Sequence, residues 1–423
     1  MAATPQTAAQ KLLAQASGRS HVAVGEVVYP DPALVIIHDG YVEAAYKELT
    51  ALGFGAVRNP ERVMFVTDHE VAYGSQAAVA RGAANREVAK RWNIGHMYDA
   101  GRGGHGHLFP METGLVGPGM FLFAYDMHCT NFGAVGALAL GVGTEITTVL
   151  ATGSLWTQAP ATIRIELTGR LGLGIRARDV GFMLAHGLAS GRWGVEYDYR
   201  VIEFGGPGIE ALGWSERVAL CNSVTEIGIA SVLFAAPPVG VPIPAGADIL
   251  SDPGAMYQDI IEIDLSQIQP QLALPGGPEN ASPIAAAAGT PIQHAFLGAC
   301  GSGMFEDFAD AAALLRGRRI AEGVRLFVAP GSVATARRMA DEGISQVFMD
   351  AGAVMLPAGC GACANGSMAP LGADEVSIST AATNHAGRFG PPGGQAFLGS
   401  PLTVAASALR GCITDSRNLS DDE

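Results

Sequence analysis

The chain has little positive charge, few cysteines and no long uninterrupted apolar run. It carries 26 Lys and Arg against 40 Asp and Glu, a net charge of −14, which argues against nucleic-acid binding because that needs a clustered basic face. Six cysteines in 423 residues form no dense disulfide framework and are typical of a reducing cytoplasm. Residues 227–234, the most apolar stretch, are too broken by nearby prolines to continue across a bilayer. Residues 1–19 lack a secretory pattern. We therefore expect a cytoplasmic protein that binds neither nucleic acid nor a membrane.

What the chain does contain is apolar and glycine-rich sequence. Apolar residues make up 48 %, charged residues 16 %, and there are 56 glycines, as in a large, loop-rich globular protein of two to three domains. Short apolar runs at 34–37 and 63–66 each end in polar side chains, His38-Asp39 and Thr67-Asp68-His69, and helix-like segments follow. This alternation predicts α/β layers, with functional residues at the carboxyl ends of strands.

A further α/β pattern begins late in the chain. Residues 264–283 are polar and proline-rich, which predicts a linker. Beyond it we expect, in chain order, a strand at 295–297, a helix at 305–315, a strand at 324–328, a helix at 333–342 and a strand at 347–349. The expected division is a first domain at 1–130, a second at 131–265, a linker at 266–284 and a third domain at 285–423.

Three cysteines lie in glycine-rich loops. Cys360 and Cys363 form a C-x-x-C pair within residues 359–366, and Cys300 lies within residues 297–303. Thiolates select iron–sulfur clusters, zinc or copper(I), and three of them would leave one iron of a cubane cluster open as a Lewis acid. A zinc site would need two more ligands, but no second C-x-x-C and no H-x-x-x-H occurs. From spacing alone, a metal or cluster site, a redox pair and plain buried cysteines remain open.

Two acid–histidine pairs are candidates for proton transfer. Asp68 directly precedes His69, and a carboxylate can orient an imidazole and raise its basicity. The alternative is a helix N-cap Asp followed by a surface His. Asp126 and His128 are two residues apart, which on a strand puts them on one face. There the alternative is a hydrogen-bonded structural pair.

Four more residues are candidates of the same kind. Asn222 and Glu226 are four apart and would share a face of a helix, or form a solvated or capping pair. His107 is either a participant in proton transfer or an ordinary hydrogen-bonded histidine. Arg388, in a glycine-rich loop, could make a forked contact with a carboxylate or brace its own loop.

These residues stand in motifs that resemble those of a known family. The chain resembles the aconitase superfamily nearly end to end, most closely the large subunits of isopropylmalate isomerase (3-isopropylmalate dehydratase). The family's cluster loops, G-S-C-T-N and G-C-G-x-C-x-G, stand here as residues 298–302 and 359–366. The other matching motifs follow in family order: Thr67-Asp68-His69, Gly104-His105-Gly106-His107, Asp126-Met127-His128-Cys129-Thr130, residues 221–228 and Gly387-Arg388-Phe389-Gly390.

The resemblance implies a fold, a cofactor and a reaction. The fold would be α/β and aconitase-like, with three α/β/α layered domains around a central cleft that holds an iron–sulfur cluster. Cys300, Cys360 and Cys363 fall on the three [4Fe–4S] ligands, and the reaction would be reversible dehydration of a small hydroxy (di)carboxylic acid. Asn222 and Arg388 would bind substrate, Asn222 together with Glu226 at the iron-bound oxygen and Arg388 at a carboxylate. The implied catalytic residues are Asp68, His69, His107, Asp126, His128 and Glu226.

The chain departs from the family's pattern at three places. N-R-N-F is replaced by residues 382–385, Ala-Thr-Asn-His, so Thr383 stands where the family has an arginine that binds a substrate carboxylate. The Ser of D-S-H is Met127, and the T-N after the first cluster cysteine is Gly301-Ser302. Threonine cannot replace a bidentate guanidinium, and Met127 adds apolar volume. We therefore expect Met127, Thr383 and Asn384 to contact a substrate with one carboxylate fewer, or a more apolar group, than isopropylmalate or citrate.

The resemblance also implies a partner. In single-chain relatives a swivelling domain supplies a serine base and further arginines. This sequence ends at Glu423, near where the family's large subunits end, so we expect a separate small subunit and little turnover by the chain alone. Three other interpretations are a hydratase for a methylmalate-, maleate- or citraconate-type diacid, a non-catalytic iron–sulfur regulatory protein, and a zinc hydrolase.

Overall fold

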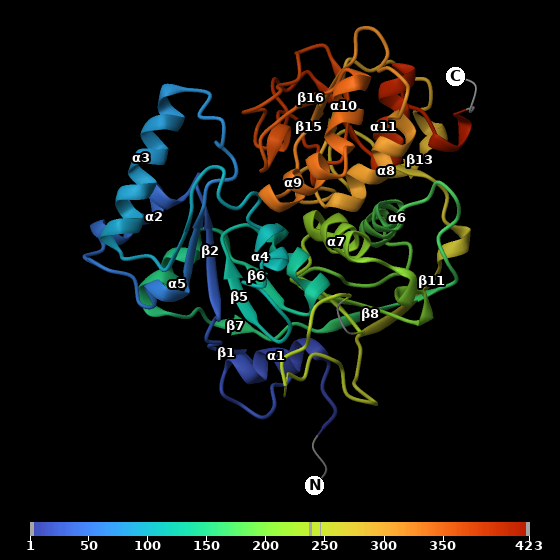
Figure 1. The fold of residues 1–423 in the computed structure, drawn as a ribbon. Helices are drawn as coiled ribbons and strands as arrows, with labels where there is room; N and C mark the ends of the chain where they lie inside the picture. Colours follow the sequence, from blue (N-terminus) through green and yellow to red (C-terminus); the bar gives the residue numbers. More distant parts are fainter. Residues whose placement is uncertain (1–3, 237–238, 246, 420–423) are drawn as a thin grey trace.

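The computed structural model describes residues 4–236, 239–245 and 247–419. Three units follow one another along the chain, each built on its own parallel or largely parallel sheet (Figure 1). The α/β class predicted from the sequence is confirmed. The expectations about a leader and about the end of the chain involve residues 1–3 and Glu423, which lie outside the described residues.

The first unit is a five-stranded parallel sheet in the order β4-β3-β2-β5-β6. Its strands are β2 (Leu34–His38), β3 (Val63–Val66), β4 (His96–Tyr98), β5 (Phe121–Ala124) and β6 (Leu138–Gly141). Val35 and Ile37 pack with the helices α2 (Val42–Ala51), α3 (Gln76–Arg91) and α5 (Ile146–Thr152). Leu34 and Ile36 pack toward the second unit. Both faces are apolar because both are covered.

The second unit is a four-stranded parallel sheet in the order β10-β9-β8-β11. Its strands are β8 (Thr162–Thr168), β9 (Val201–Gly205), β10 (Ser231–Phe234) and β11 (Asp259–Asp264). Its main helices are α6 (Ala177–Ala189) and α7 (Trp214–Ser223), whose apolar residues share one core with the sheet. The short strands β1 (Val27–Val28) and β7 (Thr157–Gln158) pair separately, and α1 (Ala8–Ala16) begins with a capping box between Thr7 and Gln10.

A 3₁₀ helix, η2 (Met127–Val135), joins the first two units. It packs against β6 of the first unit and against β10 and α7 of the second. Gly133 makes the close approach possible, because a Cβ there would overlap the backbone carbonyl of Val232. The body of η2 is therefore held between the first two sheets.

The third unit is a seven-stranded sheet in the order β13-β12-β18-β17-β14-β15-β16, with β12 antiparallel to both of its neighbours. Its strands are β12 (Gln271–Ala273), β13 (Ala281–Pro283), β14 (His294–Leu297), β15 (Arg325–Val328), β16 (Val354–Met355), β17 (Val376–Ser379) and β18 (Gln395–Leu398). Its helices are α8 (Phe305–Leu315), α9 (Val333–Asp341), α10 (Ile344–Ala351) and α11 (Pro401–Arg410). In Figure 1 this unit, orange to red, covers α7 and the short α4 (Phe109–Glu112), which contact α8 and α9.

Two expectations about the third unit differ from the structure. The strand expected at 347–349 is wrong, because this segment lies inside α10. Ile344, Val347, Phe348 and Ala351 are its buried residues, a helical spacing that a three-residue window cannot distinguish from a strand. The linker expected at 266–284 contains β12 and β13, which extend the third sheet as an antiparallel pair. Its prolines end and connect these strands instead of marking a free segment.

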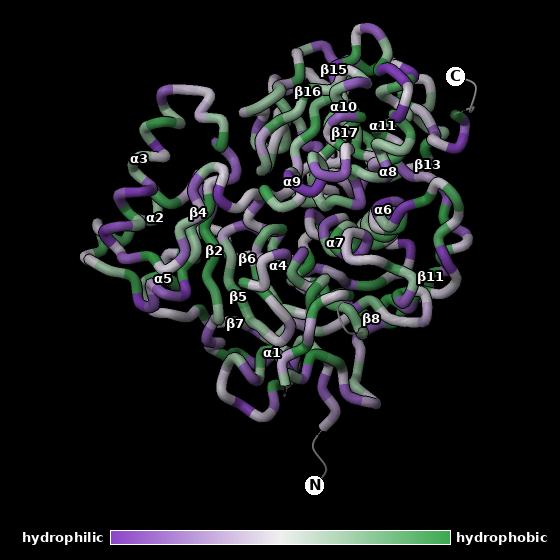
Figure 2. Tube along the Cα trace, in the orientation of Figure 1, coloured by the Kyte–Doolittle hydropathy of each residue, from purple (hydrophilic) through white to green (hydrophobic). Residues whose placement is uncertain are grey.

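Hydropathy follows this layering. In Figure 2 the strands at the centre of the first sheet are largely hydrophobic, while the outer helices alternate between hydrophilic and hydrophobic residues. Within the described ranges, every helix is too short or too polar to traverse a lipid bilayer.

The contact at Gly133 gives a test of how the first two units are joined. Gly133→Ala should lower the free energy of unfolding by about 1–3 kcal/mol, as overpacking of a well-packed site does, because the added methyl would overlap Val232. The matched control is Gly117→Ala, where a Cβ meets no atom within 4 Å. Thermal unfolding followed by circular dichroism measures both. An unchanged melting temperature for Gly133→Ala would contradict the tight contact.

Candidate active site

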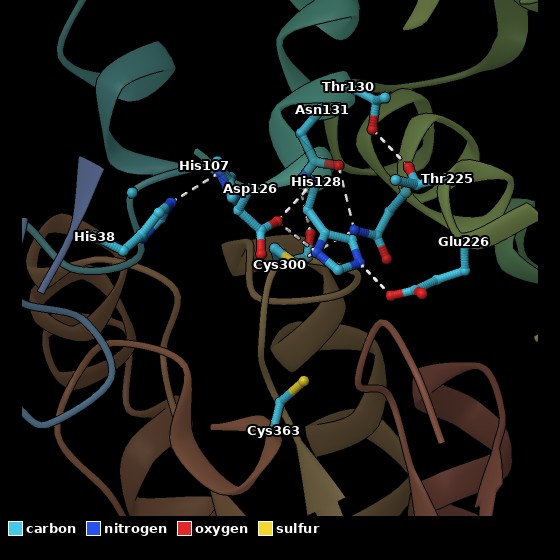
Figure 3. A network of polar contacts seen from close by, with 12 residues as sticks. His38, His107, Asp126, His128, Thr130, Asn131, Thr225, Glu226, Cys300 and Cys363 are labelled. Atoms are coloured by element: carbon cyan, nitrogen blue, oxygen red, sulfur yellow. Dashed lines mark hydrogen bonds and ion pairs between the residues drawn. The ribbon is translucent and has the colours of Figure 1, made fainter. Parts of the chain in front are cut away.

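Loops from all three units converge where the strands of the first sheet end. His38 ends β2, Asp68 and His69 follow β3, and Asp126 follows β5. The third unit brings the two cysteine loops, one after β14 and one after β16. Figure 3 shows Cys363 with its sulfur directed toward Asp126 and His128. Residues far apart in the sequence thus meet at one place, as carboxyl-end loops of α/β sheets do.

Cys300, Cys360 and Cys363 are all buried free thiols. Their sulfurs act on one another electrostatically, Cys300 with Cys363 and Cys360 with Cys363. Burial raises the pKa of Cys300 and of Cys360 well above the ordinary value. Burial acts in the same sense on Cys363, but the guanidinium of Arg388 and the backbone N–H of Ala382 outweigh it and lower the pKa of that thiol.

The backbone around the cysteines is shaped to bring three sulfurs inward. Ala299 adopts φ +61° immediately before Cys300, a conformation that L-residues rarely take. Gly361, between Cys360 and Cys363, has φ +60°, and a Cβ there would lie 2.6 Å from the Phe296 ring. Three converging soft donors in a dry, tightly turned pair of loops are the donor set that fits an iron–sulfur cluster. A zinc ion held by the same three sulfurs would need a fourth ligand, and His105 and His107 do lie near Cys300.

Asp68 organises the histidines of the first unit. It is fully buried and accepts hydrogen bonds from His38 Nδ1 at 2.9 Å, His69 Nδ1 at 2.7 Å and the backbone N–H of Gly106 at 2.8 Å. Burial alone would raise its pKa, but the His38 and His69 rings hold the pKa of Asp68 well below the usual range. Burial lowers the pKa of His69, yet the Cys360 sulfur and the carboxylates of Asp68 and Asp39 raise it well above the usual value.

His38 connects this carboxylate to His107. The two Nε2 atoms lie 3.0 Å apart, so one ring donates and the other accepts (Figure 3). Burial lowers the pKa of His107 well below its usual value, and its Nδ1 is buried without a hydrogen-bond partner among the described residues. His38 was not among the predicted site residues. The sequence did contain an indication of its role, because His38-Asp39 stands at the end of one strand just as Asp68-His69 stands after the next strand.

His128 lies between two carboxylates. Its Nδ1 is 2.8 Å from Asp126 Oδ1 and its Nε2 is 2.9 Å from Glu226 Oε1 (Figure 3). Burial disfavours the charge, but the two acids raise the pKa of His128 to about 10. The pairing of Asp126 with His128 was predicted on a strand. The structure instead makes Asp126 the N-cap of η2, where it also accepts the backbone N–H of His128.

Asn222 and Glu226 do not share a helix face, contrary to prediction. Helix α7 ends at Ser223, and Glu226 lies in the following 3₁₀ turn η5 (Thr225–Ile227). Asn222 instead donates to Cys300 Sγ at 3.3 Å and to Asn131 Oδ1 at 3.3 Å. Asn131, which the sequence did not single out, donates to the Cys300 carbonyl at 2.9 Å. The two amides therefore hold the Cys300 loop.

A cavity of about 400 Å³ opens beside these groups. Arg388 lies on its wall and reaches Cys363 Sγ at 3.7 Å and Asn365 Oδ1 at 3.4 Å. Met127 is 49 % exposed, and the buried hydroxyl of Thr383 has no hydrogen-bond partner within the described chain. The residues that line the cavity are Asp126, Met127, His128, Glu226, Asn365, Thr383, His385, Ala386, Gly387 and Arg388.

Asn384 does not line this cavity, contrary to its predicted contact with substrate. Its Nδ2 donates to the backbone carbonyls of Leu274 at 2.8 Å and Ala396 at 2.9 Å. The side chain therefore holds the loop that carries Thr383 against β12 and β18. Sequence reasoning could not separate these roles, because an asparagine amide serves a ligand and a backbone equally well.

Comparisons with known proteins show which proteins this chain is similar to. The model of the Aconitase family (aconitate hydratase) matches residues 10–237 and 245–411. The 3-isopropylmalate dehydratase large subunit of Herpetosiphon aurantiacus is 35 % identical over 98 % of both chains. The probable methanogen homoaconitase large subunit of Methanothermobacter thermautotrophicus is 34 % identical over 96 % of both. The crystal structure of Thermococcus kodakaraensis aconitase X (holo-form) has a similar fold, with a TM-score of 0.51 and 12 % identity over 89 % of each chain. As its cysteine loops predict, this chain belongs to the aconitase family.

Proposed function

We propose that this chain, a hydro-lyase of the aconitase family, is the large subunit of a two-chain enzyme that reversibly dehydrates a small hydroxy (di)carboxylic acid. We further propose that Cys300, Cys360 and Cys363 hold a [4Fe–4S] cluster. One observation carries the proposal: three buried, unpaired cysteines interact with one another beside a cavity whose wall includes His128 and Arg388, and Arg388 lies 3.7 Å from Cys363 Sγ. A reducing compartment such as the cytoplasm suits free thiols of this kind.

The cluster and the chain have separate tasks in this reaction. When bound, the cluster supplies a Lewis-acidic iron that lacks a protein thiolate. His128, charged at neutral pH because its pKa is about 10, can donate its proton to a departing hydroxyl group. Glu226 and Asp126 hold the ring in place and, as carboxylates, stabilise its charged form. Arg388, on the wall of the cavity, can bind a carboxylate of the substrate.

A second route for proton transfer is supported by the hydrogen-bonded series of Asp68, His38 and His107. His107 is uncharged at neutral pH because burial lowers its pKa, so it can accept a proton at its unpartnered Nδ1. The base that removes the carbon-bound proton is assigned to a small subunit. The names of the relatives support such a partner, since they are described as large subunits.

The substrate class follows from the two side chains that replace polar groups of the family. Thr383 and Met127 both lie at the cavity, and neither binds a carboxylate with two parallel hydrogen bonds. A substrate with one carboxylate fewer, or a more apolar group, than isopropylmalate fits this wall. A non-catalytic regulator would have no use for Asp126, His128 and Glu226 in one ion-paired row.

Metal analysis tests the cofactor. After anaerobic purification and reconstitution, the chain should contain about four iron and about four acid-labile sulfide, as a cubane cluster requires. Cys360→Ser should lose most of both. The control is Cys412→Ser, since Cys412 lies outside the cysteine loops beside Thr414. Bound zinc, or no metal after reconstitution, would contradict the proposal.

A histidine titration tests the charge of His128. In wild type its imidazole should titrate near pH 10, and Glu226→Gln should lower this pKa because one of two paired carboxylates is lost. The ion pairs stabilise the fold fully below the ordinary histidine pKa of about 6.5, and this contribution is lost as the pH rises through about 10. NMR of the imidazole carbon-bound protons measures the shift, with exposed Glu262→Gln as the control. Titration near pH 6.5 in wild type would rule out the proposed acid.

Restoring the arginine tests the substrate class. With the small subunit present, Thr383→Arg should raise kcat/KM for 3-isopropylmalate tenfold or more, since a charge-assisted hydrogen bond contributes about 1.5–3 kcal/mol. Thr383→Val adds no charge and should give no gain. Steady-state hydration kinetics measure both variants. Efficient use of isopropylmalate by the wild-type enzyme would refute the smaller or more apolar substrate.

A further inference from the structure

Arg178 is a buried arginine beside the cysteine loops. It lies on α6 of the second unit and is only 1 % exposed. Nη1 donates to Asn222 Oδ1 at 3.4 Å, and Nη2 donates to the carbonyl of Ala381. The guanidinium carbon lies 4.9 Å from the centre of the Phe182 ring, and Nε is buried without a hydrogen-bond partner in the described part of the chain.

This guanidinium lacks the usual counter-charge. Among the residues that the structure describes, no carboxylate oxygen lies within ion-pair distance of Arg178, although several other arginines have one. Burying a charge is costly unless it is paired. The two acids that influence Arg178 accept backbone N–H groups instead: Asp179 from Arg176 and Gln271, and Asp307 from Met304.

Two of the cysteine sulfurs would supply the negative charge when they hold the proposed cluster as thiolates. Burial lowers the pKa of Arg178 to about 10, so it keeps its charge at neutral pH, and Cys300 and Cys363 act in the opposite sense. Arg178 also touches Asn222, which donates to Cys300 Sγ. The charge therefore reaches the cysteines through space and through one hydrogen-bonded amide.

Gly301 makes room for this side chain. A Cβ at Gly301 would overlap Arg178 Nη1 and lie 2.6 Å from Asn222 Oδ1. Gly301 does not have the positive φ that would require glycine, unlike Gly298 in the same loop. Its lack of a side chain is therefore explained by space for the guanidinium. Gly301 is also one of the positions where the chain departs from the G-S-C-T-N motif.

We propose that Arg178 is the counter-charge of the cluster thiolates. Because Gly301 has no side chain, it leaves the space in which the Arg178 guanidinium lies next to the Cys300 loop. The proposal rests on the cluster assigned under the proposed function. Arg178 acts as a positioning and electrostatic residue, because it touches Asn222 and Ala381 and not the substrate cavity. A nearby positive charge favours the more negative, reduced form of a cluster and so raises its reduction potential.

Four variants of the full chain, reconstituted anaerobically, test this role. Arg178→Gln should move the midpoint potential to a more negative value and speed iron loss to a chelator at least threefold. Arg178→Lys, which keeps the charge, should stay close to wild type in potential. Gly301→Ala should lose iron faster because its methyl meets the guanidinium, and Gly301→Ala with Arg178→Lys should regain part of the loss. The midpoint potentials are measured by a redox titration that is monitored by electron paramagnetic resonance.

The control is Arg217→Gln on α7. Arg217 is also buried, at 3 % exposed, but it contacts the Ile209 carbonyl and the Phe234 ring. An equal shift of the midpoint potential in this control, or a wild-type midpoint potential in Arg178→Gln, would overturn the role proposed for Arg178 but not the proposed function. If Arg178→Gln does not fold, additive iron loss in the Gly301→Ala and Arg178→Lys double variant would overturn it. A wild-type chain without iron would instead overturn the proposed function, and this inference with it.

Discussion

Charge that is excluded from water must find a partner inside the protein, and the centre of this molecule depends on that requirement. Asp68 is satisfied by two imidazoles and one backbone N–H, and His128 by two carboxylates. Each of these groups would be expensive to bury alone. The pairing therefore fixes ring orientations and protonation states together. Under the proposed function, the three cysteines would take their counter-charge from the iron of the cluster.

The scaffold meets this requirement by bringing three sheets to one point. Neither the first nor the third unit alone presents both the histidines and the sulfurs. The backbone joins the two sets directly, because the Cys360 N–H donates to the Asp68 carbonyl at 2.9 Å. Asp68 thus orients two imidazoles with its side chain and holds a cysteine loop with its main chain. Gly133 and η2 fix the second unit in the same arrangement.

The sequence predicted the chemistry of the site better than its geometry. The two cysteine loops are distinctive because few other functions place three thiols among so many glycines, and the ordered motifs indicated the family. Local conformation was harder to predict. Asp126 caps a 3₁₀ helix instead of lying on a strand, and residues 347–349 are helical, because two or three residues do not define a period. The sequence did not single out Arg178, because an arginine near the start of a helix is a common surface residue. Its burial is visible only in the structure.

The order of the site residues along the chain has a consequence for biosynthesis. Arg178 and α6 leave the ribosome more than a hundred residues before the Cys300 loop that covers them, and α7 leaves it more than seventy residues before that loop. Until that loop arrives, the nascent chain presents a cationic side chain and an apolar surface to the solvent. The last of the three loop cysteines, Cys363, precedes Arg388, which favours its thiolate. Loading of the proposed cluster would therefore follow synthesis of the third unit.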